Sequence, residues 1–159
     1  MTKKRVYVES TVPSYLTAEP SIDDLLRAQQ GLTKVWWERR ADWFCFLTPI
    51  VLWEISRGDK GAAAKRREKE LLLSELPSSP EARALANLLV ARKLVPETKA
   101  VDALHIALAA FHRADYLLTW NQTHLDNIVL RSRIEELIRG WGLTPAAVIT
   151  PERLMEEPI

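Results

Sequence analysis

The sequence predicts an α/β fold in which a mostly parallel β-sheet is flanked by helices. Short runs of β-branched and aromatic residues, typical of strands, recur four times along the chain. Longer segments in which apolar residues follow a helical spacing lie between them. Consecutive strands are therefore joined by helical crossovers, which are the connections that parallel strands require.

Length and composition are those of one globular domain. A chain of 159 residues, 47% apolar and 27% charged, can bury a sizeable core, and we expect a single domain over residues 1–159. The net charge of +1 does not require a polyanionic partner, so any affinity for nucleic acid must come from local clusters. The one cysteine, Cys45, lies in an apolar run and excludes an internal disulfide and a cysteine-based zinc site.

No targeting or membrane-spanning segment is recognisable in the sequence. The N-terminal residues lack the apolar region of a signal peptide, and no run approaches the roughly 18 apolar residues of a membrane span. We therefore expect a cytoplasmic protein with no membrane contact.

The N-terminal part is expected to form one strand and two helices. Residues 5–8 are β-branched and aromatic, as in a strand, and Pro13 suits an early position in a helix. Apolar residues then recur at helical spacing over residues 21–40. Trp36 and Trp37 point about 100° apart on this helix, so we expect one in the core. The other either contacts a partner or packs beneath a neighbouring helix.

A second strand, over residues 43–47, is followed by three helical segments. Thr48-Pro49 begins the first, which ends at Gly58. Residues 59–76 are charged and helical in pattern, which indicates a solvated helix with local ion pairs or, alternatively, a cationic rim for a phosphate backbone. After a proline-containing loop, another helix is expected over residues 82–94.

A helix over residues 99–113 is the centre of the predicted fold. It is apolar almost all round, as in helices buried in a core, and Thr98 is suited to cap it. The apolar run at residues 116–119 indicates a buried parallel strand. An amphipathic helix over residues 124–140 and a last strand over 147–150 follow, with a helical turn after them.

Three acids and one amide lie at strand ends or within the helices that follow. Glu9 follows the first strand, Glu54 lies in an apolar helical turn after the second, and Asp102 is in the first turn of the central helix. Asn121 follows the third strand. Each could simply be a solvated, turn or helix-end residue. In a parallel sheet, however, residues just past the strand ends face one crevice, so we expect these side chains to converge.

Converging carboxylates require a cation. Two carboxylates about 4 Å apart repel by roughly 4 kcal/mol at an effective dielectric constant near 20, which equals about three pK units. A divalent ion removes this conflict, and oxygen ligands favour Mg²⁺ or Mn²⁺, which can bind phosphate oxygens and activate water. A zinc hydrolase is disfavoured, because His105 and His112 share a helix face without a third ligand, and we expect His105 to be a satisfied near-core histidine. A serine hydrolase lacks its G-x-S-x-G motif.

Four motifs follow one another over nearly the whole chain. They are residues 6–11 (VYVEST), Glu54 after the second strand, residues 102–107 (DALHIA) and residues 117–121 (LLTWN). In this order and spacing the chain resembles PIN-domain proteins, and among them the VapC-like toxins of type II toxin–antitoxin pairs. The resemblance implies a PIN-like three-layer fold with about five mostly parallel strands between helices. It also implies a Mg²⁺- or Mn²⁺-dependent endoribonuclease that hydrolyses RNA phosphodiester bonds.

The resemblance also implies partners and site residues. The partners are an RNA substrate, a second copy in a homodimer and a cognate antitoxin that docks on helices near the cleft. On this interpretation Trp36, Trp37 and the arginines after them would belong to the partner surface. The implied catalytic residues are Glu9, Glu54, Asp102 and Asn121, the first three as metal ligands, with supporting hydroxyls on Ser10, Thr11 and Thr119.

Two positions depart from the family pattern. Glu9 and Asn121 stand where the family usually has aspartate, so the site has one charge fewer and a second metal should bind more weakly. Asp126, a little further along the chain, is an auxiliary candidate. The alternative to a nuclease is therefore a catalytically weakened PIN-like module that acts through protein or RNA binding. A DNA-directed nuclease is a third alternative, because the charge does not distinguish RNA from DNA.

Overall fold

A computed structural model describes residues 2–159, and within them five parallel strands form one sheet in the order β3-β2-β1-β4-β5. This confirms the α/β class and the parallel sheet predicted from the sequence. The central strand is β1, which pairs with β2 on one side and with β4 on the other. The strands are β1 (Arg5–Val8), β2 (Phe44–Leu47), β3 (Ser74–Glu75), β4 (Tyr116–Leu118) and β5 (Ala147–Ile149).

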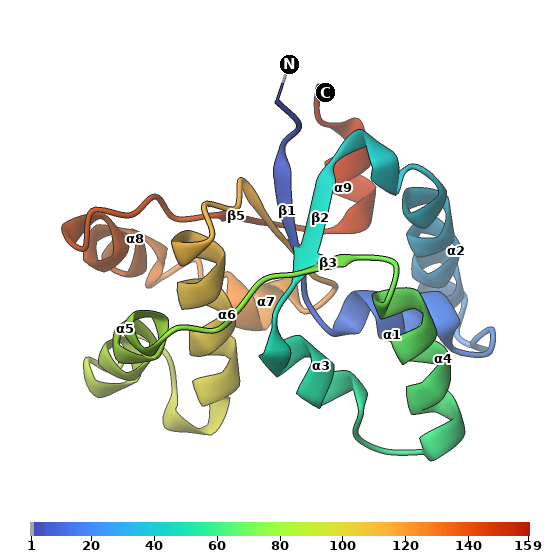
Figure 1. Cartoon of the computed structure of the whole chain (residues 1–159), viewed down its shortest axis with the longest axis horizontal. Coiled ribbons are helices and arrows are strands. Elements are labelled where there is room, and N and C mark those ends of the chain that lie inside the picture. The colour runs from blue at the N-terminus through green and yellow to red at the C-terminus, as the bar shows by residue number, and fades with distance from the viewer. Residues whose placement is uncertain (1) are drawn as a thin grey trace.

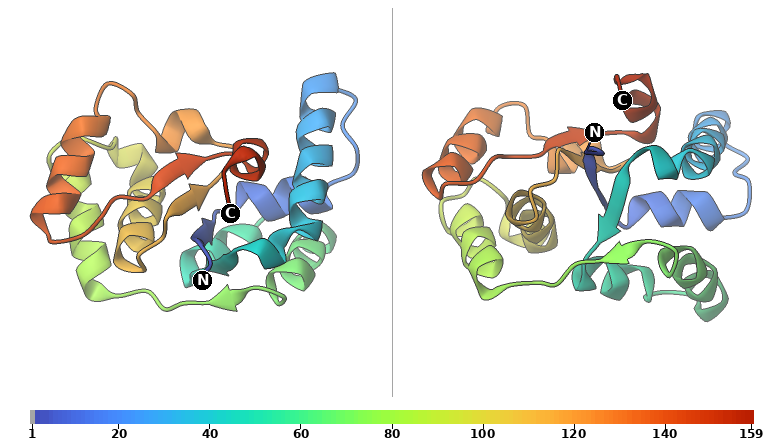
Figure 2. Two further views of the ribbon diagram at one scale, coloured as in Figure 1. Left: turned by 90° about the horizontal axis from the view of Figure 1, so that it is seen from above. Right: turned by 45° about the horizontal axis from the view of Figure 1, so that its top comes forward.

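Helices cover both faces of the sheet (Figure 1). One core cluster lies between the sheet and α3, α5, α6 and α8, and a second lies between the sheet and α1, α2 and α9. The view from above shows these two groups on opposite sides of the strands (Figure 2). The helices are α1 (Thr11–Thr17), α2 (Asp24–Glu38), α3 (Pro49–Ile55), α4 (Lys60–Glu70), α5 (Pro80–Ala91), α6 (Ala100–Phe111), α7 (Gln122–Leu125), α8 (Arg131–Gly140) and α9 (Pro151–Glu156), with 3-10 turns at Arg40–Asp42 and Glu97–Lys99.

Three short helices begin where strands end, at the carboxyl edge of the sheet. The helix α1 begins three residues after β1, α3 begins two residues after β2, and α7 begins four residues after β4. The backbone ladder continues past the strands at this edge, because Glu9 N donates to Leu118 O at 3.0 Å and Thr119 N donates to Ile149 O at 3.0 Å. The residues just beyond β1 and β4 are therefore held in fixed positions.

The helix α6 is buried through small side chains. Ala103, Ala107 and Ala110 are buried in the core cluster that α6 shares with the sheet and α5, together with the larger Leu108. Small residues let the backbone of a helix lie close to its neighbours. Thr98, expected to cap this helix, does not do so: α6 begins after a 3-10 turn, and its N-cap residue Lys99 makes no capping bond with its side chain.

The edge strand β3 was not predicted. The sequence pattern indicated one helix over residues 59–76, but α4 ends at Glu70 and the chain then extends to pair with β2, with Phe46 opposite Ser74 and Leu47 opposite Glu75. Two residues carry no periodicity, and both side chains are exposed. This strand depends on the neighbouring β2 rather than on its own sequence.

The single helix predicted over residues 124–140 is also wrong. The structure has α7 and α8, separated by an irregular segment. After α7 ends at Leu125, the side chain of Asn127 holds a turn that leads into α8: its Oδ1 accepts from Val129 N at 3.0 Å and from Leu130 N at 3.2 Å. Such local side-chain bonds compete with helical backbone bonds.

Both tryptophans of α2 lie inside the protein. Trp36 is fully buried and Trp37 is nearly so, which contradicts their assignment to a partner surface. The alternative, packing of Trp37 beneath a neighbouring helix, is confirmed: Lys69 of α4 and Arg40 lie over its ring, with the Arg40 guanidinium 4.1 Å from the centroid. Cys45 is buried and free, as expected. Across residues 2–159 no helix combines the length and the apolar character needed to cross a membrane.

We predict that Ala107→Leu destabilises the protein, because Ala107 is fully buried and the larger side chain must displace its neighbours. Overpacking of this kind costs about 1–3 kcal/mol. The free energy of unfolding from urea titration measures it. Ala84→Leu on the exposed side of α5 is the matched control, with an expected change below about 0.5 kcal/mol. Equal effects at the two positions would contradict the close packing of α6.

Candidate active site

Glu9 is a buried acid at the centre of the carboxyl edge of the sheet. It follows the central strand β1 directly, and only 4% of it is exposed. A buried carboxylate is costly unless donors surround it. The alternative in which Glu9 is a solvated loop residue is therefore wrong, and the structure must supply its hydrogen bonds.

Hydroxyl groups from two distant parts of the sequence supply those bonds. The side chains of Thr11 and Thr119 each donate to Glu9 Oε2 at 2.6 Å. Ser10 Oγ donates to Oε1 at 3.0 Å, and Thr11 N is within 3.1–3.2 Å of both oxygens. The structure thus brings the three hydroxyl residues singled out in the sequence together around one carboxylate.

These hydroxyls also connect the ends of β1 and β4. Thr119 is fully buried, and its Oγ1 accepts from Asn121 N at 2.9 Å while it donates to Glu9. Thr11 Oγ1 accepts from Trp120 N at 2.9 Å. Asn121 is half-buried at the start of α7, and its side chain makes no capping bond to that helix. Its amide is therefore not committed to the turn that follows β4.

Glu54 and His105 approach the site from two different helices. Glu54 lies near the end of α3, with 25% of its side chain exposed, and its Oε1 is 2.6 Å from Nε2 of the fully buried His105 of α6. Glu9, Glu54 and His105 each offer a ligand atom, and these atoms lie within 4.8 Å of one another. The prediction of His105 as a satisfied near-core histidine is correct, but its partner is a predicted metal ligand.

Asp102 lies near the other two acids but outside the group of ligand atoms formed by Glu9, Glu54 and His105. It is half-buried in the first turn of α6, and burial raises the pKa of its carboxyl above the usual range. The negative charges of Glu9 and Glu54 raise this pKa further, while His105 and His124 oppose the shift. The charges of Glu9 and Glu54 therefore act on Asp102, whose role as a metal ligand stays a prediction.

The donor set fits a hard divalent cation. Glu9, Glu54 and Asp102 offer carboxylate oxygens, which Mg²⁺ and Mn²⁺ prefer, and repulsion from Glu9 and Glu54 adds to the burial that raises the pKa of Asp102. A cation would relieve that repulsion. His105 supplies nitrogen, which suits softer metals, but both of its ring nitrogens already have hydrogen-bond partners.

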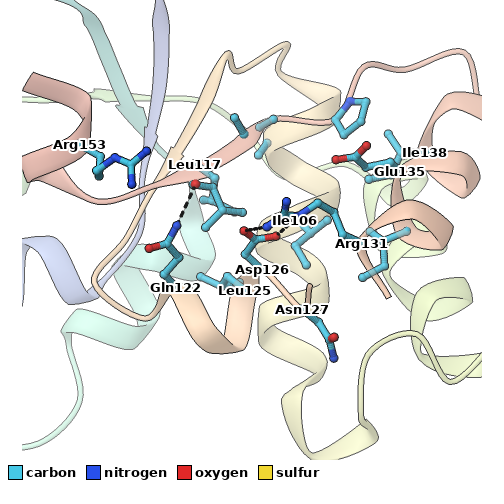
Figure 3. Close-up of a pocket in the computed structure, with 16 residues that line it drawn as sticks. Ile106, Leu117, Gln122, Leu125, Asp126, Asn127, Arg131, Glu135, Ile138 and Arg153 are labelled. Atoms are coloured by element: carbon cyan, nitrogen blue, oxygen red, sulfur yellow. Dashed lines mark hydrogen bonds and ion pairs between the residues drawn. The ribbon is translucent and has the colours of Figure 1, made fainter. Parts of the chain in front are cut away.

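Asp126 lies in a different environment. Both of its carboxylate oxygens accept from Arg131, with Nε to Oδ1 at 2.7 Å. The pair lines a cavity of about 390 Å³ between α6, α7, α8 and β5, and the Asp126 carboxylate faces Arg131 there (Figure 3). Asp126 is not part of the group formed by Glu9, Glu54 and His105.

Sequence reasoning did not connect His105 with Glu54, because 51 residues separate them. One signal was present: Asp102 and His105 are three residues apart, and residues at this spacing share a helix face. A histidine on the same face as a predicted metal ligand, in an otherwise apolar helix, indicates a polar contact within the core.

We predict that Thr119→Val lowers the free energy of unfolding by about 1–3 kcal/mol. The valine keeps the shape of the side chain but removes a donor to Glu9 and an acceptor for Asn121 N. Urea titration measures the change. The exposed Thr144 provides the control, since Thr144→Val should change stability by less than about 0.5 kcal/mol. A Thr119→Val protein as stable as the control would show that Glu9 does not depend on this hydroxyl.

We predict that Asp102→Asn stabilises the metal-free protein at neutral pH. Because the pKa of Asp102 is raised by folding, the folded state binds its proton more tightly, and stability falls as pH rises from the usual aspartate pKa through the raised one. Asparagine avoids this loss. Melting temperatures in EDTA measure it, at roughly 2–4 °C per kcal/mol for a chain of this size.

The gain should shrink as the pH falls towards the usual aspartate pKa, since Asp102 is then protonated in both states. Glu136→Gln, at an exposed position of α8, controls for the loss of one negative charge. A gain that is the same at neutral and acid pH, or equal to that of the control, would contradict the prediction.

Comparison with known proteins identifies the fold. No protein-family model and no curated protein sequence matches the chain. Among solved structures, VapC20 of Mycobacterium tuberculosis, a toxin that cleaves the sarcin-ricin loop, is similar with a TM-score of 0.56 and 17% sequence identity. The match covers 70% of this chain and 86% of that chain. The chain therefore has the PIN-like α/β fold that its sequence predicts, shared with a VapC toxin.

Proposed function

We propose that this protein is a metal-dependent endoribonuclease, acting in the cytoplasm as the toxin of a type II toxin–antitoxin pair. One observation carries the proposal: Glu9 and Glu54 offer ligand oxygens within 4.8 Å of each other at the carboxyl edge of a parallel sheet. Asp102, on α6 one turn before His105, is near enough for their charges to add to the burial that raises its pKa. The shared fold supports it, since the similar structure is that of an RNA-cleaving toxin.

The three acids would hold Mg²⁺ or Mn²⁺, with Asn121 contributing a neutral oxygen. The ion supplies charge stabilisation at phosphate oxygens and an activated water. The chain's own residues prepare the site: hydroxyls of Thr11 and Thr119 fix Glu9, and His105 holds one oxygen of Glu54. Burial, and then the charges of Glu9 and Glu54, raises the pKa of Asp102, so its carboxylate form, the one that binds a cation, costs more here than in water.

A surface beside Glu54 suits a nucleic-acid strand. Trp53 is 50% exposed, and the Arg57 guanidinium lies 4.8 Å from its ring centroid. Exposed aromatic rings stack on bases, and arginine adds charge and cation–π attraction. A groove of about 370 Å³ runs from Trp53 between α3, α5 and α6, with Arg83 in its wall. These features support a single-stranded substrate segment on this side of the acids.

We also propose a homodimer and a cognate antitoxin as partners. Because Trp36 and Trp37 are buried, the partner surface cannot include them. The exposed side of α2 that borders these tryptophans is a better candidate: Leu25 and Val35 are exposed, and Leu32, one turn before Trp36, is partly exposed. Together they make an apolar stripe along the helix.

A catalytically weakened module that binds RNA or protein is the second candidate. Asn121 removes one charge from the acidic set. A carboxylate has about four lone-pair positions, and those of Glu9 already receive bonds from Ser10, Thr11 and Thr119. A cation at Glu9 would therefore compete with donors of the chain.

We predict cleavage of RNA that requires Mg²⁺ or Mn²⁺ and falls by about 100-fold or more in kcat/KM in Glu54→Gln and Asp102→Asn, because each removes a charge worth several kcal/mol at the metal. Gel assays on single-stranded and structured RNA, and on DNA of the same sequence, measure it. Glu136→Gln on α8 is the control and should retain full activity.

Each outcome has a meaning. RNA or protein binding that changes neither with Mg²⁺ nor with Asp102→Asn, in a folded protein that cleaves nothing, would establish the weakened module. Equal cleavage by wild type and variants would place the activity elsewhere. Preference for the DNA substrate would keep the site and change the substrate class.

A further inference from the structure

Three buried polar side chains form a chain of hydrogen bonds behind Glu54. Thr48 Oγ1 is 2.8 Å from Tyr7 Oη, and Tyr7 Oη is 2.8 Å from His105 Nδ1. The other ring nitrogen, His105 Nε2, is 2.6 Å from Glu54 Oε1. Thr48, Tyr7 and His105 are all fully buried, and none is among the metal ligands proposed above. A buried polar network of this kind has a cost unless every member is satisfied.

If the His105 imidazole is neutral, only one order of donors and acceptors is possible along this series of hydrogen bonds. A carboxylate only accepts, so His105 Nε2–H donates to Glu54. His105 Nδ1 is then the acceptor and takes the Tyr7 hydroxyl proton, and the Tyr7 oxygen accepts from Thr48. Burial raises the pKa of Tyr7 above its usual range, which keeps the phenol protonated and able to donate. In this series of hydrogen bonds every donor has an acceptor, and the last donor, His105 Nε2–H, bonds to the Glu54 carboxylate.

The chain also connects the elements that carry the site. Tyr7 is on β1, Thr48 precedes α3, and His105 is on α6. The bond from His105 to Glu54 joins α6 to α3, and Asp102 lies on α6 one turn before His105. The same bond therefore sets the position of Glu54 relative to Asp102.

We propose that His105 is a positioning residue of the metal site: through the Thr48–Tyr7–His105 chain it holds Glu54 Oε1 and leaves Oε2 to bind the cation. The inference rests on the proposed metal-dependent function and assigns residues outside its acidic set. Orienting partners of metal ligands are worth about 10- to 100-fold in metal affinity or activity.

The competing role for His105 is that of a ligand, because its ring nitrogen lies within 4.8 Å of oxygens of Glu9 and Glu54. Direct ligation would require Nε2 to lose its proton and its bond to Glu54. The Glu54 carboxylate would then lose the hydrogen bond that it accepts from His105. A positioning role keeps all four groups satisfied.

Mn²⁺ binding to the metal-free full chain tests the inference without relying on activity. Titration followed by electron paramagnetic resonance gives the dissociation constant, and electron spin-echo modulation reports nitrogen bound directly to Mn²⁺. We expect His105→Leu to weaken Mn²⁺ binding by about 10-fold or more, His105→Gln to recover part of the loss through its N–H, and Tyr7→Phe to weaken binding to a lesser extent. His112→Gln, at the C-cap of the same helix with its ring bonded to Pro77 O, is the control with unchanged affinity.

The results separate the possible failures. A coordinated-nitrogen signal in wild type that is lost in His105→Leu would overturn positioning in favour of ligation. Unchanged Mn²⁺ affinity in His105→Leu, or in Tyr7→Phe if the leucine variant does not fold, would show that His105 only packs in the core and does not position Glu54. A wild type that binds Mn²⁺ with the expected variant pattern but cleaves no RNA would overturn only the nuclease. A wild type that binds no Mn²⁺ would overturn both.

Discussion

Burial of the Glu9 carboxylate at the end of the central strand is the constraint on which the rest of the site depends. An ionised group in this place is tolerated only when donors surround it. Those donors come from Thr11, at the start of α1, and from Thr119, after β4. Because Thr11 also accepts from Trp120 N, the same atoms join two strand ends that are more than a hundred residues apart in sequence. The same hydroxyl groups therefore hold the Glu9 carboxylate in place and join the ends of β1 and β4.

The helix α6 combines opposite requirements along its length. Its alanines pack closely into the core, while Asp102 and His105, near its first turn, face the acids. Burial, with a smaller contribution from Glu9 and Glu54, raises the pKa of Asp102, so an ionised Asp102 lowers the stability of the folded protein. Such a cost is typical of functional sites, where residues are arranged for a ligand rather than for the stability of the free protein.

Local pattern was sufficient for the strands of the central sheet and for the acids that follow them. The strand at residues 5–8 and the apolar helix after Thr98 are recognisable because the spacing of apolar residues in the sequence reflects which side chains are buried. The strand β3 left none, since two exposed residues pair only because β2 lies beside them. The turn between α7 and α8 is held by side-chain bonds of Asn127, which the apolar spacing of this segment does not reveal. The contact between Glu54 and His105 exists only in space, so periodicity could not reveal it.

Both edges of the sheet are short. On one side β3 offers two residues, and on the other β5 offers three. A partner that bound by adding a strand would gain few backbone hydrogen bonds at either edge, and short edge strands also resist unwanted pairing between copies. Recognition of this protein by another chain must therefore proceed through helix faces and side-chain pockets. An inhibitor designed as an extended β-strand peptide would form few backbone hydrogen bonds with these edges, whereas an amphipathic helix could pack against the exposed helix faces.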